Sequence, residues 1–386
     1  MAGWSNHGKS NVMTLRSVAL LGIGLCAVAT AQTGHRPVKI VGNRHTLALF
    51  ADGTVMAWGS YNRGELGPLS AVKQARFVAS APVTIRLPQR AKDIAAGDGC
   101  SFALLEDGTV AAWGTNQGMM LGSEAAASEN PSIISELTGV VKIAAGGQTA
   151  LALLRDGTVV GWGRNFDRAK PAPVESLVNI KELSVSETHT MALDASGSVW
   201  TFGNSFYGSL GRMDSPEKAK IVASLSGVAA IAAGDGVSTV VKRDGTVWVW
   251  GSNYQGQFGN GDRSPAPVSG GLNNKVQLTP QPVAGVRNAV AVTTGMGGRH
   301  TMVLLKDGTL RGWGNPDWGQ LGGGVSGTFQ TSVMTPKISG VRSIFAIGNN
   351  SYAIKQDGSF WVWGLGHRDE YPLQKVTSTP VSLSLK

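Results

Sequence analysis

The sequence predicts an all-β chain that folds into a seven-bladed β-propeller of four-stranded antiparallel blades, with a C-terminal strand closing the ring by joining the first blade. A Gly-containing turn recurs seven times, and an aromatic residue followed by Gly stands six positions after the start of each turn. The composition agrees, because 53 glycines and only 15% charged residues among 386 suit short strands joined by frequent turns.

The repeated turn predicts a hairpin in every unit. Asp-Gly suits a two-residue hairpin turn, in which a positive φ is needed. Apolar residues alternate on both sides, as in 149–153 and 246–250, and a period of two indicates paired antiparallel strands. The turns are 52–53, 107–108, 156–157, 196–197, 244–245, 307–308 and 357–358, and the aromatics are Trp58, Trp113, Trp162, Phe202, Trp250, Trp313 and Trp363.

Two further strands complete each predicted unit. A small-residue strand precedes the hairpin, as in 94–97 and 231–234, and small side chains suit the crowded inner edge of a radial sheet. A Pro-containing piece, such as 81–85 or 281–283, lies before the small-residue strand. Proline fits an edge strand, where the missing N–H does little harm. We therefore expect the Pro-containing strand to open each four-stranded unit.

The spacing of the turns predicts inserted loops, and the chain ends predict how the ring closes. Turn glycines are 40 residues apart between Gly157 and Gly197 but 63 apart between Gly245 and Gly308. Residues 38–42 match the small-residue strand without a preceding Pro-containing strand, and 379–383 resemble the missing piece. We expect this C-terminal piece to complete the first blade and leave no open sheet edge. The chief insertions, expected on one face, are 68–81, 123–137, 260–280 and 323–335.

The first 31 residues predict a cleavable secretion signal, followed by the propeller at 32–386. Basic Lys9 and Arg16 precede an apolar stretch, 18–28, and Ala29 to Ala31 supply small residues for cleavage. The stretch is too short to span a bilayer. We therefore expect an exported protein, in a periplasm, outside the cell or on its surface. The mature charge would be 32 − 25 = +7 without a dense basic run, so we expect no nucleic-acid binding.

The repeat resembles that of the regulator of chromosome condensation family over essentially all of 38–386. The shared elements are A-A-G, A-L-x-x-D-G and V-x-x-W-G-x-N-x-x-G-Q-L-G, and the best copies are 250–259 and 313–322. The resemblance implies a seven-bladed propeller. The third and seventh units lose the G-x-L-G tail after Gly163 and Gly364. Founding family members are nuclear exchange factors for a small GTPase, a setting that a secretion signal argues against.

No residue pattern indicates catalysis, a cofactor or a metal ion. His45, His189 and His300 occupy one repeat column, and we interpret it as a strand start where a polar group bonds the neighbouring blade. Residues 295–298 superficially resemble a phosphate loop but lack the strand and helix around it. The turn aspartates are interpreted as turn formers with local hydrogen bonds. An enzyme with an axial active site stays open as an alternative, as does an exchange factor.

The tips of the second hairpins are the candidate partner-binding site. Two positions between an Asn column and the next Gly are rich in aromatic and Arg residues, the types enriched at binding hot spots. The alternative is that these side chains pack against the inserted loops. The candidate residues are Tyr61, Arg63, Phe206, Tyr207, Tyr254 and Trp318.

The sequence thus predicts an exported protein-binding scaffold. We expect it to present the hairpin tips and inserted loops of one face to another protein or to a cell-surface component. We also expect a monomer with no cofactor and no membrane span. The predicted mode of binding resembles that of secreted relatives with this propeller, including a β-lactamase-inhibiting type that binds its target with loops on one face.

Overall fold

In the computed structural model the described strands begin at Pro37 and end at Leu383. The secretion signal expected at 1–31 lies outside the described residues and stays a prediction. No helix among the described residues is long and apolar enough to cross a membrane. The described residues are 36–60, 63–68, 78–124, 126–204, 206–212, 216–263, 276–295, 297, 300–327, 330–365 and 375–385.

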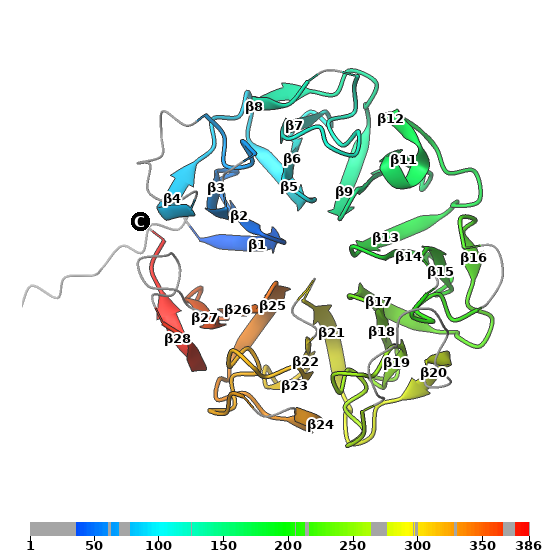
Figure 1. Cartoon of the computed structure of the whole chain (residues 1–386), viewed down its shortest axis with the longest axis vertical. Coiled ribbons are helices and arrows are strands. Elements are labelled where there is room, and N and C mark those ends of the chain that lie inside the picture. The colour runs from blue at the N-terminus through cyan, green and yellow to red at the C-terminus, as the bar shows by residue number, and fades with distance from the viewer. Residues whose placement is uncertain are drawn as a thin grey trace, which may run out of the picture. The chain divides into compact units, whose positions relative to one another are not determined.

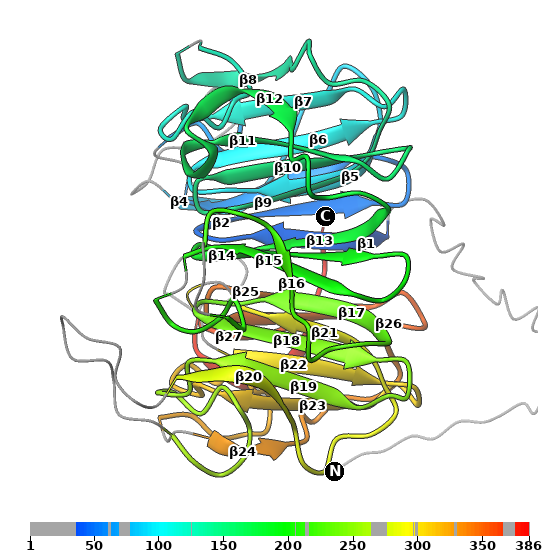
Figure 2. The ribbon, with the colours of Figure 1, turned by 90° about the vertical axis from the view of Figure 1, so that its right-hand side faces the viewer.

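Seven four-stranded antiparallel sheets surround a central axis, which confirms the predicted seven-bladed propeller (Figure 1). Every blade is built from four strands that are consecutive in the chain. The strands run between the two faces of the ring, as the view turned by 90° shows (Figure 2). We number the blades 1 to 7 in chain order.

The strands fall into four classes by their place in a blade. The innermost strands are β1 (Pro37–Gly42), β5 (Ala91–Ala96), β9 (Val140–Gly146), β13 (Ile180–Val185), β17 (Val228–Ala233), β21 (Ala289–Thr294) and β25 (Val341–Ile347). The second strands are β2 (His45–Phe50), β6 (Cys100–Leu105), β10 (Thr149–Leu154), β14 (His189–Asp194), β18 (Val237–Lys242), β22 (His300–Leu305) and β26 (Asn350–Lys355).

The third strands carry the repeated aromatic residue and Gly near their ends. They are β3 (Val55–Ser60), β7 (Val110–Gly114), β11 (Val159–Gly163), β15 (Val199–Gly203), β19 (Val247–Gly251), β23 (Leu310–Gly314) and β27 (Phe360–Gly364). The outer strands are β4 (Val78–Thr84), β8 (Ser128–Ile133), β12 (Arg168–Pro173), β16 (Lys220–Ile221), β20 (Gln277–Pro282), β24 (Gln330–Met334) and β28 (Thr377–Leu383).

The small-residue strands are innermost and the Pro-containing strands are outermost, as predicted. Pro82 in β4, Pro131 in β8 and Pro380 in β28 all lie in edge strands, which pair on one side only. The missing N–H of proline therefore costs little there. At the inner edge, alanines such as Ala95 and Ala232 leave room for seven strands to converge on a central channel.

The predicted closure of the ring is wrong. Strand β28 pairs with β27 of its own blade, through Trp361 with Ser382 and Val362 with Val381. The first blade has its own outer strand, because β4 pairs with β3. The Pro-containing strand therefore ends a blade instead of opening one. No strand crosses between the first and last blades among the described residues, and side-chain packing joins them instead: Phe50 and Trp58 of blade 1 share one apolar cluster with Tyr352 and Phe360 of blade 7.

The turn aspartates act as the sequence predicts. Asp107 accepts hydrogen bonds from the backbone N–H of Thr109 at 2.9 Å and from its hydroxyl at 2.7 Å. Asp156, Asp244 and Asp307 bond the threonine two residues later in the same way. These bonds favour the ionised carboxylate and hold the pKa of each of the four below its ordinary value.

Five of the repeated tryptophans bond a blade to the one before it. All six repeated tryptophans, one in every third strand except β15, are among the largest fully buried side chains. The indole N–H of Trp113 donates to the Glu65 carbonyl oxygen at 2.9 Å, in the turn that follows the third strand of the preceding blade. The same bond joins Trp162 to Met120, Trp250 to Ser209, Trp313 to Gln257, and Trp363 to Gln320.

The three histidines of the repeat column also bond the neighbouring blade, as the sequence interpretation holds. His45 Nε2 lies 2.8 Å from Ser101 Oγ, and that hydroxyl donates to the Glu65 carbonyl oxygen at 2.9 Å. Since the single serine proton goes to the carbonyl, the histidine is the donor to the serine oxygen. His189 with Ser238 and His300 with Ser351 repeat this arrangement.

Candidate functional site

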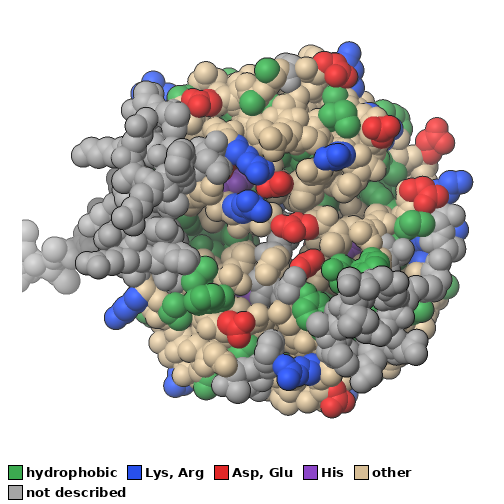
Figure 3. All heavy atoms as spheres, in the orientation of Figure 1, with side chains coloured by type: hydrophobic (Ala, Val, Ile, Leu, Met, Phe, Trp, Pro, Cys, Tyr) green, Lys and Arg blue, Asp and Glu red, His purple; other side chains and the backbone are tan. Residues whose placement is uncertain are grey.

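The candidate site is the face of the ring that we call the tip face. It carries the first turn of each blade, between its innermost and second strands, and the tip turn that follows the third strand. Figure 3 views this face and shows acidic and basic side chains around the axial opening. The opposite face carries the Asp-Gly turns. The tip turns described are 63–67, 115–122, 206–211, 252–259 and 315–322.

Side chains from fixed repeat columns hold the backbone of each tip turn. The Asn253 side-chain oxygen accepts from the Phe258 N–H at 2.9 Å, and Gln257 Oε1 accepts from the Gln255 N–H at 2.8 Å. Gly256 between them has a φ of 76°, a conformation that favours glycine. In blade 6, Gln320 Oε1 accepts from the Trp318 N–H at 2.9 Å. The tips are therefore rigid, while their own side chains are free to vary.

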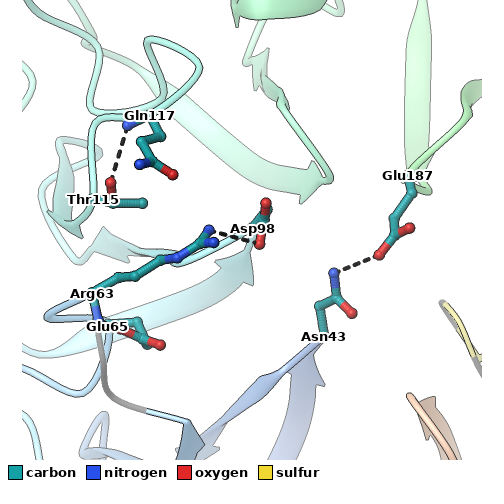
Figure 4. Close-up of polar contacts among 7 residues, drawn as sticks. All are labelled: Asn43, Arg63, Glu65, Asp98, Thr115, Gln117 and Glu187. Atoms are coloured by element: carbon teal, nitrogen blue, oxygen red, sulfur yellow. Dashed lines mark hydrogen bonds and ion pairs between the residues drawn. The ribbon is translucent and has the colours of Figure 1, made fainter.

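Two of the six sequence-predicted residues are turned toward the next blade. Arg63 forms an ion pair with Asp98 at 3.2 Å (Figure 4), and its side chain lies over Gly99, whose added Cβ would be 2.6 Å from the Arg63 Cδ. The Tyr207 ring covers Gly236 in the same manner. These two side chains pack against the first turn of the following blade, and their role in partner binding stays a prediction.

Two other predicted residues are open to a partner. Phe206 is 43% exposed and Trp318 is 41% exposed, although both are large apolar side chains. The Phe206 ring meets Tyr207 edge-on at a centroid distance of 5.2 Å, which fixes its position. Tyr254 is half-buried, and Tyr61 lies outside the described residues. Phe206, Tyr254 and Trp318 belong to blades 4, 5 and 6, so they form one arc of the tip face.

Acidic residues in the first turns border the axial opening, and the sequence interpretation missed them. Asp98, Glu187 and Asp235 occupy these turns in blades 2, 4 and 5. Glu187 accepts a hydrogen bond from Asn43 Nδ2 at 2.8 Å, so blades 1 and 4 are bridged across the opening (Figure 4). The available signal was an acid directly after the small-residue strand, as in Gly97-Asp98-Gly99 and Gly234-Asp235-Gly236.

Glu65 supports the tip turn of blade 1 from below. It is 1% exposed, and its carboxylate accepts from the Arg63 N–H at 2.7 Å. Burial raises the pKa of Glu65 above its ordinary value, and the hydrogen bonds and the Arg63 charge oppose that shift. Glu65 takes the column that holds Gln257 and Gln320 in other blades, so its role is to position the tip.

The buried polar groups of the ring do not form a catalytic centre. His45 and Ser101 are 0% exposed and their hydrogen bonds are used between blades, so no substrate reaches this pair. Burial also raises the pKa of the Cys100 thiol well above its ordinary value, which leaves little reactive thiolate. Within the part of the chain that the structure describes, no three His, Cys, Asp or Glu side chains are arranged to hold a metal ion.

Comparison with known proteins places the chain in the family that the repeat resembles. Models of the Regulator of chromosome condensation (RCC1) repeat match residues 41–65, 140–168, 228–257 and 244–304. The Arabidopsis thaliana Ultraviolet-B receptor UVR8 is 30% identical over 346 residues, which cover 87% of this chain and 67% of the receptor. The chain therefore belongs to the RCC1 repeat family.

Other relatives share the propeller inside different proteins. The human E3 ubiquitin-protein ligase HERC2 is 27% identical over 332 residues, or 83% of this chain, but the match spans only 6% of the ligase. The crystal structure of Prp20p from Saccharomyces cerevisiae superimposes with a TM-score of 0.73 at 21% identity, covering 91% of this chain and 88% of that one. At this identity the structural likeness shows the fold alone.

Proposed function

We propose that this propeller is an exported protein-binding scaffold whose tip face receives another protein. The observation that carries the proposal is the arc of Phe206, Tyr254 and Trp318, in which large aromatic side chains stand exposed or half-buried on rigid turns. Aromatic side chains held in place bring a large contact area at a small cost in conformational entropy, as binding hot spots require. The structure of the similar Prp20p was described with its binding properties to Gsp1p and histones, so a propeller of this fold binds proteins.

The charges of the tip face suggest the chemistry of the partner. Acidic Asp98, Glu187 and Asp235 occupy first turns on the tip face, where Asp98 is paired with Arg63 and Glu187 accepts a hydrogen bond from Asn43. A partner that places an apolar patch on the arc and a Lys or Arg side chain at the axial opening would match both features. Charged residues at such a rim mainly raise the association rate, while buried aromatic contacts slow dissociation.

The test uses partners captured from the exported proteome of the source organism. We expect Phe206→Ala combined with Trp318→Ala to weaken binding of the captured partner by at least about tenfold, the loss typical of a hot-spot residue. Val178→Ala is the control, because Val178 is 49% exposed and follows an outer strand on the opposite face. Equal binding by the double variant and the native protein would refute the tip face as the contact surface.

Export has a separate test, because it rests on the first 31 residues alone. We expect the protein expressed with its full N-terminus to leave the cytoplasm and to lose residues 1–31. N-terminal sequencing of the exported form measures the cleavage site directly. A protein that stays intact inside the cell would remove the export part of the proposal and leave the binding face untouched.

A further inference from the structure

The central channel is a binding-sized cavity that the tip-face proposal does not use. The seven innermost strands surround it, and it has a volume of about 540 Å³ (Figure 1). That volume lies within the range of small-molecule sites in proteins. The channel wall is made of strands, the most rigid elements of the ring. A ligand held there would meet a preformed surface.

One repeat position decides the chemistry of the wall. In blades 1 to 4 the third residue of the innermost strand lines the channel, just after a β-bulge that is seen as a register shift such as that between Ile180 and Glu182. A bulge re-aims the side chains beside it. In blades 1 to 4 this residue is charged with alternating sign, and in blades 5 to 7 it is small. In order the residues are Lys39, Asp93, Lys142, Glu182, Ala230, Ala291 and Ser343.

The first charged pair, Lys39 and Asp93, forms a direct ion pair. Lys39 Nζ lies 2.5 Å from Asp93 Oδ1. Asp93 also accepts from the Ile94 N–H at 3.0 Å and, across the blade boundary, from the Ile143 N–H at 3.1 Å. Both carboxylate oxygens of Asp93 are therefore engaged, and these contacts link blades 1, 2 and 3.

The second charged pair is open. Lys142 and Glu182 lie on neighbouring blades and both line the channel, yet among the described residues neither forms a direct ion pair or hydrogen bond. Lys142 is nevertheless the cation that most lowers the pKa of Glu182, against a larger rise from burial. The two charges influence each other without forming a direct ion pair.

The opposite half of the channel is lined mainly by apolar residues, with Thr293 and Thr294 as its polar side chains. Ala232 and Ala233 of blade 5 and Phe345 and Ile347 of blade 7 line it. The polar Thr293 of blade 6 is already engaged, because its hydroxyl accepts from the Ala346 N–H at 3.2 Å. One side of the channel thus carries Lys142 and Glu182, and the other side is mainly apolar.

We propose that the channel binds a small zwitterion with an apolar side chain, the chemistry of a free α-amino acid or of a short apolar peptide. Its carboxylate would lie against Lys142, its ammonium group against Glu182, and its side chain against Ala232 and Phe345. A ligand with one charge alone would leave Lys142 or Glu182 without its new partner. This site goes beyond the tip-face function and does not depend on it.

The test is calorimetric titration with L-leucine, alongside leucinamide and N-acetyl-leucine, which each lack one charge. We expect saturable leucine binding at millimolar concentration and weaker binding of both derivatives. Glu182→Gln and Lys142→Gln should each weaken leucine binding by about tenfold or more, the range of one charge-assisted hydrogen bond. Lys170→Gln, on outer strand β12, is the charge-matched control and should bind normally.

Two further measurements make the outcome decisive. Thermal unfolding of each variant shows whether the ring is intact, so that lost binding is not lost folding. Titration with leucyl-leucine distinguishes a free amino acid from a short peptide as the ligand. The ligand that binds more tightly, leucine or leucyl-leucine, indicates which of the two the channel accepts. Absence of binding by either ligand, or binding that both channel variants leave unchanged, overturns the proposal.

Discussion

The histidines between blades are buried in the packing of the ring and also form hydrogen bonds between neighbouring blades. His189 lies 3% exposed between blades 4 and 5, with Nε2 2.7 Å from Ser238 Oγ and Nδ1 3.2 Å from Ser186 Oγ. Burial lowers the pKa of His189 to about 3 and that of His45 to about 4. The folded ring therefore keeps both imidazoles neutral at pH values where an unfolded chain protonates them.

These shifts predict a loss of stability in mild acid. An unfolded histidine binds a proton as the pH falls through about 6.5, whereas folded His45 stays neutral until about pH 4. Its contribution to the free energy of unfolding therefore falls by about 3 kcal/mol between these pH values and then levels off. In thermal unfolding at pH 7 and pH 5, His45→Gln should show a smaller pH effect than the native protein. Equal pH effects would contradict the assignment.

The outer strand is the element whose place we predicted wrongly from the sequence. A Pro-containing strand is half-exposed whether it opens or ends a blade, so its own pattern fits both arrangements. The strands with strong patterns were predictable: β6, β10 and β22 alternate around the Asp-Gly turns, and their register follows from that turn. The order of the outer strands depends on pairing across an inserted loop, which local pattern does not encode.

The pairing of the outer strand can be tested by removing strand β28. Removal of residues 377–386 would expose β27 of blade 7 and strip Val381 and Leu383 from the apolar cluster shared with blade 1. We expect a sharply lower melting temperature, because a sheet edge and an apolar surface become exposed together. Removal of residues 1–31, which precede the first described strand, is the control. An unchanged melting curve after the C-terminal truncation would contradict the pairing.

At the scale of the whole molecule, the ring brings together residues that no local pattern connects. Asn43 and Glu187 are 144 positions apart, yet they form a hydrogen bond at the axis. The acidic residues of the first turns and the charged residues of the channel come close to one another only when the seven blades form the ring. The exposure of the tips was predictable from the repeat, because the residue type at the tip positions varies from blade to blade and is not needed for packing. The orientation of the Arg63 and Tyr207 side chains toward the next blade was not predictable, because each side chain packs on a glycine of that blade.

The boundary between the last and first blades decides whether the ring behaves as one unit. Tyr352 in β26 and Phe102 in β6 occupy the same repeat column, and both are buried. The Phe102 ring meets Trp162 of blade 3 at a centroid distance of 5.9 Å, and Tyr352 lies in one apolar cluster with Trp58 of blade 1. At both boundaries the aromatic residue of this column therefore shares an apolar cluster with the repeated Trp of the following blade.

This equivalence predicts the effect of matched truncations. Tyr352→Ala and Phe102→Ala should each lower the free energy of unfolding by about 3–5 kcal/mol, the cost of a cavity left by a large aromatic residue. Urea unfolding followed by tryptophan fluorescence and by far-ultraviolet circular dichroism should show one coincident transition for both variants, because a closed ring has no terminal blade to fray. A much smaller loss for Tyr352→Ala, or an early partial transition confined to it, would mean that blades 7 and 1 are joined more weakly than the other blades and that the propeller opens at this boundary.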